Sequence, residues 1–138
     1  MAMADANHHE VLAELERGPF SAALRLKIEA HGEGDATVRM PFAEGILNAG
    51  GPEVPIHGGA IAALADFAAC AAVWTMPATR ASATISMSVN YAAPAVRTDL
   101  VARARVRGGG RRVASIAVEI RDQQNRLIAD ALVTYKIA

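Results

Sequence analysis

A single carboxylate interrupts a long apolar stretch of this sequence. Between Ala60 and Met76 the only charged residue is Asp66, and eight of these 17 residues are alanine. A carboxylate on an apolar helix is costly to bury unless it has a partner or water. Asp66 is therefore either a helix residue with solvent contact or a structural hydrogen bond, or a cleft carboxylate that acts as a base or nucleophile.

Two consecutive glycines, Gly58 and Gly59, follow His57 where the apolar stretch begins. If a helix starts there, its first N–H groups lack intrahelical partners and point outward with the positive end of the helix dipole. Such groups can stabilise an oxyanion that develops on a carbonyl. Glycines also serve a tight turn into a helix, so the pair alone leaves both interpretations open.

Arginines gather around a run of three glycines near residue 109. They form either a solvated strand face or a site for phosphate groups, for which arginine is well suited. Nucleic acid is a poor alternative, because 14 basic and 14 acidic residues cancel and only 4% of residues are aromatic. The arginines concerned are Arg103, Arg105, Arg107, Arg111 and Arg112.

Metal, disulfide and nucleotide-loop chemistry find no pattern in the sequence. The single cysteine, Cys70, excludes an intramolecular disulfide and a cysteine-cluster zinc site. No metal-ligand spacing is present, and no glycine-rich phosphate loop follows a predicted strand. Cys70 lies in the apolar stretch with no neighbouring cation in the sequence, so we expect it to be inert packing rather than a nucleophile.

The apolar stretch at 60–76 predicts a long helix that ends at Pro77. A membrane span is the rival interpretation, but the stretch is short, rich in alanine and carries Asp66 in its middle. A helix that is apolar on all sides must instead be enclosed on most sides. Because strands are predicted before and after it, we expect one curved sheet to enclose it, and no membrane contact.

Alternating apolar and polar residues predict the strands of that sheet. A short helix at about 7–17, with Asn7 as its N-cap, ends at Gly18-Pro19. A hairpin follows at 24–30 and 36–40, and a loop at 43–56 leads to the helix. After the helix, up to four strands form an antiparallel meander, at 83–91, 102–106, 114–120 and 127–137.

The hairpin around the three glycines is constrained by its own pattern. Both of its apolar rows face the same side only if the numbers of each pair of opposite residues sum to an even number. A turn with an odd number of residues meets this condition. Gly108, Gly109 and Gly110 are the residues expected to form that turn.

Length and composition predict one domain over residues 1–138. The chain is 52% hydrophobic and 20% charged, which excludes intrinsic disorder. The polar, partly acidic N-terminus matches neither a secretory signal nor an arginine-rich transit peptide, so we expect a cytoplasmic protein.

Taken together, His57-Gly58-Gly59, the alanine-rich helix with Asp66 and a strand T-x-S-x-S-x-N-Y-x-x-P from Thr84 resemble a known family. The sequence is similar to the hotdog-fold acyl-CoA thioesterases, and most to the branch with phenylacetate-pathway and 4-hydroxybenzoyl-CoA thioesterases. The similarity covers residues 24–135 and includes the terminal L-I-A-D-A-L-V-T-Y pattern.

The resemblance implies an α+β hotdog fold, in which a curved antiparallel sheet wraps a long central helix. It also implies that two subunits join their sheets, in a homodimer or a dimer of dimers (homotetramer), with the active site at the interface. In that site the N–H of Gly58 contacts the thioester oxygen. Asp66 of the partner subunit activates water or attacks the carbonyl.

Further site residues follow from the resemblance. Family members often carry an Asn or Gln six residues before the histidine to position water; Gly51 stands there, and Asn48 would take the role through a loop three residues longer. Thr84 lines the site from the following strand. His57 and Gly59 are assigned to the substrate-binding turn, where the histidine is more often structural than a base.

The expected activity is hydrolysis of acyl-CoA to free acid and coenzyme A, without metal or cofactor. Arg111 and Arg112 would bind the phosphates of coenzyme A. A non-catalytic acyl-CoA binding or sensing module on the same fold is the alternative. A hotdog hydratase is a weaker one, because the helix lacks a histidine. The acyl group, and coenzyme A against a carrier protein, remain open.

Overall fold

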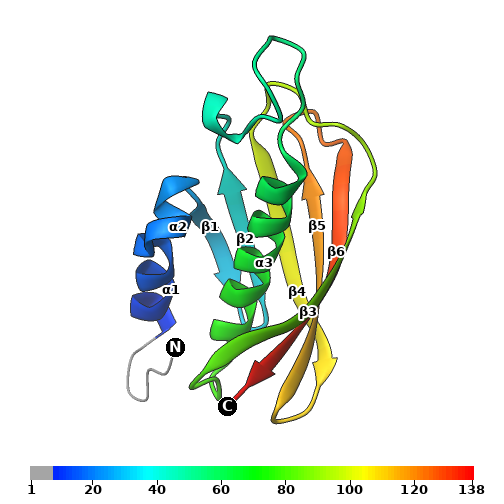
Figure 1. Ribbon diagram of the computed structural model, residues 1–138. Helices are drawn as coiled ribbons and strands as arrows, with labels where there is room; N and C mark the ends of the chain where they lie inside the picture. Colours follow the sequence, from blue (N-terminus) through cyan, green and yellow to red (C-terminus); the bar gives the residue numbers. More distant parts are fainter. Residues whose placement is uncertain (1–7) are drawn as a thin grey trace.

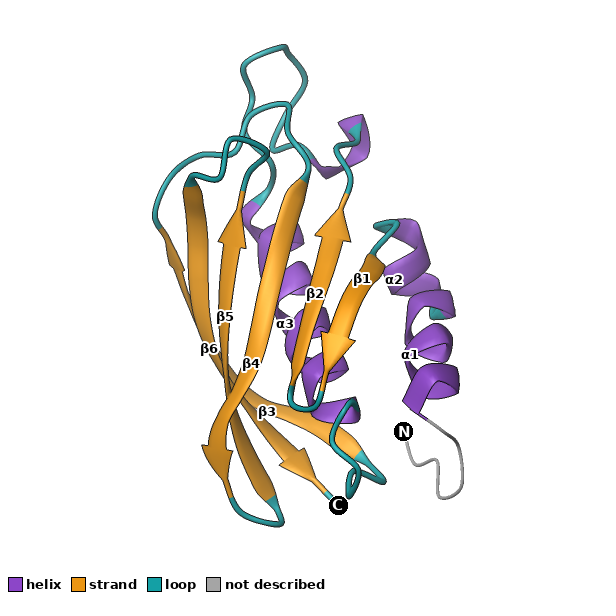
Figure 2. Ribbon diagram, turned by 180° about the vertical axis from the view of Figure 1, so that it is seen from behind, coloured by secondary structure: helices purple, strands orange, loops and turns teal. Residues whose placement is uncertain are grey.

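One six-stranded sheet forms the framework of the computed structural model, which describes residues 8–138. All neighbouring strands are antiparallel, in the order β1-β2-β4-β5-β6-β3. The sheet curves around one long helix (Figures 1 and 2), which confirms the predicted fold class. The strands are β1 (Lys27–Gly32), β2 (Asp35–Met40), β3 (Ser82–Tyr91), β4 (Leu100–Gly109), β5 (Val113–Arg121) and β6 (Leu127–Ile137).

Helix α3 (Gly58–Trp74) lies against the inner face of this sheet (Figure 1). Its alanines favour the helix and let it approach the strands closely. Most of its residues are buried, but one stripe remains partly exposed, and part of it contacts β3. That stripe consists of Ala62, Ala63, Asp66 and Cys70. Among residues 8–138, no helix is long and apolar enough to cross a membrane.

The N-terminal segment differs from its prediction. Helix α1 (His8–Arg17) occupies the predicted place, while the expected N-cap Asn7 lies outside the described residues. A second helix, α2 (Pro19–Ala23), follows directly, because a proline is well suited to the first position of a helix. The strand predicted from residue 24 therefore begins only at Lys27.

The strand order also differs from a four-stranded meander. β4, β5 and β6 form the predicted meander, but β3 pairs with β6 and becomes an edge of the sheet. The connection at 92–99 is long enough to cross the end of the sheet, so β4 pairs with β2 instead. In this arrangement β3 is an edge strand of the sheet, and α3 packs against the inner face (Figure 1).

The β4–β5 hairpin reaches the predicted register by another route. Val106 pairs with Ile116 and Ala104 with Val118, so both apolar rows face α3. Next to the turn, the numbers of paired residues sum to an odd number. A bulge at Arg107 shifts the pairing by one residue, so the sums are even in the rest of the hairpin. Gly109 has φ +129°, and a Cβ there would lie 2.1 Å from the Val113 carbonyl oxygen. Only glycine fits that position.

A second bulge changes which side chains of β3 face the helix. Thr84 pairs with Tyr135 and Ser86 with Thr134, which leaves Ile85 as the extra residue. Ser82 and Thr84 face α3 before the bulge, whereas Met87, Val89 and Tyr91 share the inner face after it. Regular alternation without a bulge would place Thr84 with the serines on the opposite face. Bulges commonly redirect side chains beside functional sites.

A buried carboxylate holds the β5–β6 turn together, and we expect its removal to destabilise the fold. Asp122 accepts hydrogen bonds from the backbone N–H groups of Gln124 and Arg126 and from the Arg126 guanidinium. Burial opposes its charge, but the bonds and the positive charge of Arg126, together with the bond from Gln124, outweigh burial and lower the pKa of Asp122. Asp122→Ala should lower the free energy of unfolding by about 1–3 kcal/mol at pH 7.

This stabilisation depends on pH in a defined direction. A carboxylate with a lowered pKa stabilises the fold above its unfolded-state pKa, and the contribution is lost as pH falls through the folded-state value. The difference between the wild type and Asp122→Ala in urea unfolding should therefore shrink below about pH 4. Glu53→Ala, at an exposed carboxylate in the loop before α3, is the control. An Asp122→Ala difference that is the same at pH 7 and pH 3 would contradict this account.

Candidate active site

Asp66 is held by hydroxyl groups from two neighbouring strands. Its Oδ1 accepts a hydrogen bond from Thr84 Oγ1 of β3 at 2.8 Å and lies 2.6 Å from Tyr135 Oη of β6. The tyrosine hydroxyl is also 2.9 Å from the Asp66 carbonyl oxygen, so its one proton is shared between two acceptors. No donor from residues 8–138 reaches Oδ2. One carboxylate oxygen is thus fixed, and the other is available to a ligand.

Tyr135 is the residue of this group that the sequence prediction missed. It belongs to the buried, otherwise apolar row of β6 and is only 3% exposed. Burial first, and then the neighbouring Cys70 and Asp66, raise the pKa of Tyr135 far above its ordinary value. Its hydroxyl therefore stays protonated and acts as a donor. A phenol in an apolar strand row is the signal that could have indicated its role.

The start of α3 separates the two glycines. His57 is the N-cap, and its Nδ1 accepts a hydrogen bond from Gly59 N at 2.8 Å. Ala60 N and Ile61 N donate to the His57 carbonyl oxygen. The Gly58 N–H alone in this first turn has no acceptor among the residues that the structure describes. Of the two predicted donors, only Gly58 is free to contact a ligand.

This cap defines the roles of His57 and Gly59. Because Nδ1 accepts the hydrogen bond from the Gly59 N–H, the neutral imidazole has its proton on Nε2. Neither ring nitrogen then has a free lone pair with which to act as a base. His57 therefore shapes the turn. A Cβ on Gly59 would lie 2.9 Å from His57 Nδ1, so glycine is required for the close contact.

Gly58 and Asp66 cannot act on the same carbonyl within one chain. They are eight residues apart on a helix that rises 1.5 Å per residue, which separates their backbones by about 12 Å. A thioester carbonyl within hydrogen-bond distance of one group is out of reach of the other. Tyr91 Oη donates to the Gly58 carbonyl oxygen at 2.8 Å and fixes β3 against this end of the helix.

Asn48 lies at the same end of the molecule as Gly58. Its N–H donates to the Pro55 carbonyl oxygen, and the adjacent Leu47 and Ile56 form an isolated β-bridge. These contacts close the loop that extends beyond the start of α3 (Figure 1). The Asn48 side chain is exposed and makes no hydrogen bond to the described part of the chain.

The predicted basic edge is divided into two groups. Arg111 and Arg112 occupy the β4–β5 turn, at the end of the sheet opposite the start of α3 (Figure 2). Arg111 lines a cavity of about 940 Å³ beyond the C-terminal end of α3. Neither arginine is brought to Asp66 or Gly58 of its own chain.

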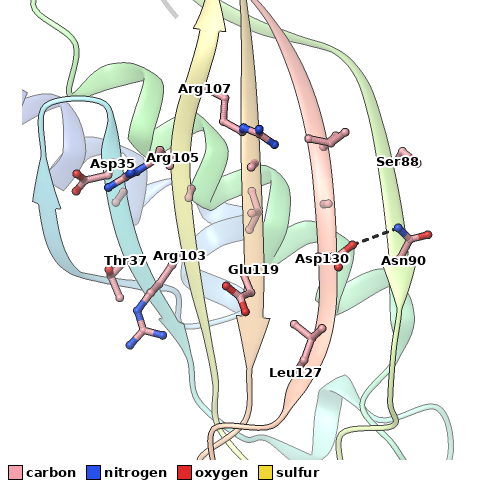
Figure 3. A pocket seen from close by; sticks show the side chains of 16 residues that line it. Asp35, Thr37, Ser88, Asn90, Arg103, Arg105, Arg107, Glu119, Leu127 and Asp130 are labelled. Atoms are coloured by element: carbon pink, nitrogen blue, oxygen red, sulfur yellow. Dashed lines mark hydrogen bonds between the residues drawn. The ribbon is translucent and has the colours of Figure 1, made fainter.

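The other arginines point away from the helix. Arg103, Arg105 and Arg107 project from β4 on the outer face of the sheet (Figure 3). With Glu119 and Asp130 from the neighbouring strands they line a shallow cavity of about 660 Å³. This mixture of charges on a solvated face agrees with the interpretation of these three arginines as ordinary strand surface.

A smaller cavity of about 420 Å³ lies directly beside Asp66. Its walls come from α1, α2, α3, β3 and β6, and most of the lining residues are apolar. Trp74 Nε1 donates to Ser82 Oγ at 2.9 Å, and Cys70 Sγ is 3.9 Å from the same oxygen. Burial raises the pKa of the Cys70 thiol, which keeps it protonated and supports its expected inert role.

Comparison with known proteins finds relatives that share this fold. The model of the thioesterase superfamily matches residues 56–129, from the residue before His57 into β6. A protein of Halobacterium salinarum that is named an esterase is 37% identical over 86 residues, which cover 60% of this chain. This chain spans 56% of the length of that relative.

Solved structures share the whole architecture. A conserved protein of Pseudomonas aeruginosa is 28% identical, covers 91% of this chain and 98% of its own, and has a TM-score of 0.81. The E. coli PaaI protein, from the phenylacetic acid degradation operon, is 26% identical with a TM-score of 0.80. It covers 94% of this chain and 91% of its own. The resemblance predicted from the sequence is thereby confirmed.

Proposed function

This chain belongs to the thioesterase superfamily, and we propose that it hydrolyses acyl-coenzyme A to a free acid and coenzyme A. The observation that carries the proposal is the asymmetric environment of the Asp66 carboxylate. Oδ1 is fixed by Thr84 and Tyr135, Oδ2 has no donor from the described residues, and Asp66 lines the adjacent cavity. A carboxylate positioned in this way can act on a bound thioester.

In the proposed reaction, Oδ2 of Asp66 removes a proton from water while the water oxygen bonds to the thioester carbonyl carbon. The negative charge that develops on the carbonyl oxygen is stabilised by the N–H of Gly58 of the partner subunit. The carbon–sulfur bond then breaks, and the proton passes to the leaving sulfur of coenzyme A. Direct attack by Oδ2, followed by hydrolysis of the resulting anhydride, is the other route through the same atom.

Two chains are needed because of the separation along α3. A two-fold axis that relates antiparallel copies of the helix, and passes near Ala62, would bring Gly58 of each chain to Asp66 of the other. The partly exposed alanines of this stripe permit close helix contact. The β3 edge supports the same axis, because Tyr91 lies at Gly58 and Thr84 at Asp66, with Met87 between them.

We therefore expect at least a dimer in solution, either a homodimer or a dimer of dimers, with at least twice the 14.4 kDa mass of the chain. Met87 is 37% exposed on the unpaired edge strand, and Met87→Lys should give inactive monomers because a lysine opposes edge pairing. Leu132→Lys is the matched control, since Leu132 is 55% exposed on the outer face of β6. Light scattering distinguishes the two, and a stable monomeric wild type at micromolar concentration would refute the two-chain site.

Arg111 and Arg112 remain proposed contacts for the phosphates of coenzyme A. Replacing both by alanine should raise KM about ten- to a hundredfold, with little change in kcat, since uniform binding is lost. The effect should shrink for a pantetheine thioester that lacks the nucleotide phosphates. Arg103→Ala with Arg105→Ala, on the outer face, is the control pair. An unchanged KM in the first double variant would leave the β4–β5 turn as ordinary surface.

A thiol-release screen tests the proposed function itself. Purified protein is incubated with acyl-CoA substrates of short, medium, long and aromatic acyl groups, and free thiol is measured. Turnover that disappears in Asp66→Asn supports the proposal. Saturable binding of the same substrates without thiol release would instead identify a non-catalytic acyl-CoA binding module.

A further inference from the structure

The cavity beside Asp66 extends along α3 mainly toward the C-terminal end of the helix. Its floor is formed by residues at the three- and four-residue spacing of one helix face, namely Ala63, Asp66, Phe67, Cys70 and Trp74. From Asp66 to Trp74 the helix rises about 12 Å. The cavity thus begins at Ala63, near the proposed two-fold axis, and its longer arm leads from Asp66 away from Gly58 of the same chain.

The walls of this cavity are mostly apolar, and most of the polar side chains from α3, β3 and β6 are already hydrogen-bonded. Ser82 accepts from Trp74, while Thr84 and Tyr135 donate to Asp66. These bonds leave few groups to recognise a polar ligand. A ligand without polar atoms along its length therefore fits the chemistry better than a hydroxylated or charged one.

The N-terminal helices form the outer wall. Leu15 of α1 and Phe20 of α2 line the cavity opposite β3. Phe20 is 68% exposed, the largest exposed fraction among the bulky apolar residues of the described chain. An apolar ligand in the cavity would remove part of this ring from water, and this burial would stabilise the bound state.

We propose that this cavity is the acyl site and that it selects an unbranched apolar acyl chain of medium length. The inference rests on the proposed thioesterase function. With the carbonyl carbon at Asp66, an extended chain of about nine carbon atoms spans the distance of about 12 Å to Trp74. Phe20 covers its side, and Trp74 limits its length.

The length of the acyl chain should control turnover. Each methylene buried in the cavity should raise kcat/KM about fourfold. We expect a rise from acetyl-CoA to octanoyl- or decanoyl-CoA and a fall of at least about tenfold for hexadecanoyl-CoA. Cys70→Phe fills the cavity halfway along and should reduce the octanoyl-to-butyryl ratio at least about tenfold. Phe20→Ala should lower the same ratio by removing one wall.

Phe42→Ala is the matched control for the aromatic substitution. Phe42 packs against the Arg97 guanidinium, 4.8 Å from its ring centre, and does not line the cavity. Its removal should leave the octanoyl-to-butyryl ratio unchanged. The inference would be overturned if the wild type releases thiol but the octanoyl-to-butyryl ratio is the same in Cys70→Phe, Phe20→Ala and Phe42→Ala. That result would leave the proposed function intact.

A binding measurement on the unmodified protein is independent of turnover. Trp74 is the single tryptophan of the chain, so its fluorescence reports on the far end of the cavity. Octanoic acid brominated at its terminal carbon should quench this fluorescence more strongly than the isomer brominated next to the carboxyl group. Equal quenching by the two isomers, or none, would overturn the inference even if thiol release is observed. Unequal quenching with no thiol release would contradict the proposed function alone.

Discussion

Asp66→Asn is expected to reduce thioester hydrolysis at least about a hundredfold while the fold remains intact. The asparagine oxygen can still accept from Thr84 and Tyr135, so the packing around the helix is preserved. What is lost is the basic or nucleophilic oxygen at the Oδ2 position. Initial rates of thiol release measure the first effect, and urea unfolding measures the second.

Asp130→Asn provides a control for the loss of one negative charge. Asp130 accepts from Asn90 on the outer face of the sheet, on the side opposite α3. We expect its variant to keep wild-type turnover. Equal turnover in Asp66→Asn and the wild type would refute the proposed role of Asp66 and favour the binding module.

Removing the free N–H of Gly58 is expected to cost about a hundred- to a thousandfold in kcat. Gly58→Pro removes this group without adding charge, and proline fits the first position of a helix. The preceding His57 has φ −58° and ψ 132°, which a residue before proline readily adopts. The turn can therefore accept the substitution.

Gly58→Ala is the control for added bulk. Its Cβ would lie 3.3 Å from the Tyr91 ring, as the proline Cβ would, but the N–H is kept. We expect Gly58→Ala to lose much less activity than Gly58→Pro. Equal losses in the two variants would assign the effect to the Tyr91 contact and remove the oxyanion role.

The two variants can be combined to test the shared site directly. In a mixed dimer of Asp66→Asn and Gly58→Pro chains, one site has both substitutions and the other has neither. Random reassociation of equal amounts should therefore restore about one quarter of wild-type activity, in contrast to the individual losses. If Gly58 and Asp66 act within one chain, mixing restores nothing.

The sequence was sufficient to predict the elements that carry strong periodicity. The charge-poor, alanine-rich segment around Asp66 indicated α3, and regular alternation indicated β4, β5 and β6. Local turn chemistry was less informative near residue 19. Pro19 was interpreted as the end of the first helix, whereas it starts a second helix. The partner of β3 could not be predicted, because a connection of this length permits several strand orders.

Within the site, sequence and structure each contributed part of the answer. The motif spacing indicated Asp66, Gly58 and the capping turn, and the structure distinguishes the free Gly58 N–H from that of Gly59. Tyr135 escaped prediction because its 69-residue separation from Asp66 leaves no local pattern. Arg111 and Arg112 were grouped with β4 arginines that the bulge and turn place elsewhere.

The bulge at Ile85 makes the pairing register of β3 as informative as its composition. If the same residues were paired without a bulge, the strand would alternate in a single phase, and Ser82 and Thr84 would turn outward together with Ser86 and Ser88. A relative with the same polar and apolar residues but no bulge at this point would keep the motif, yet its carboxylate would lose a partner. The register of this strand therefore separates complete sites from sequences that only share the motif.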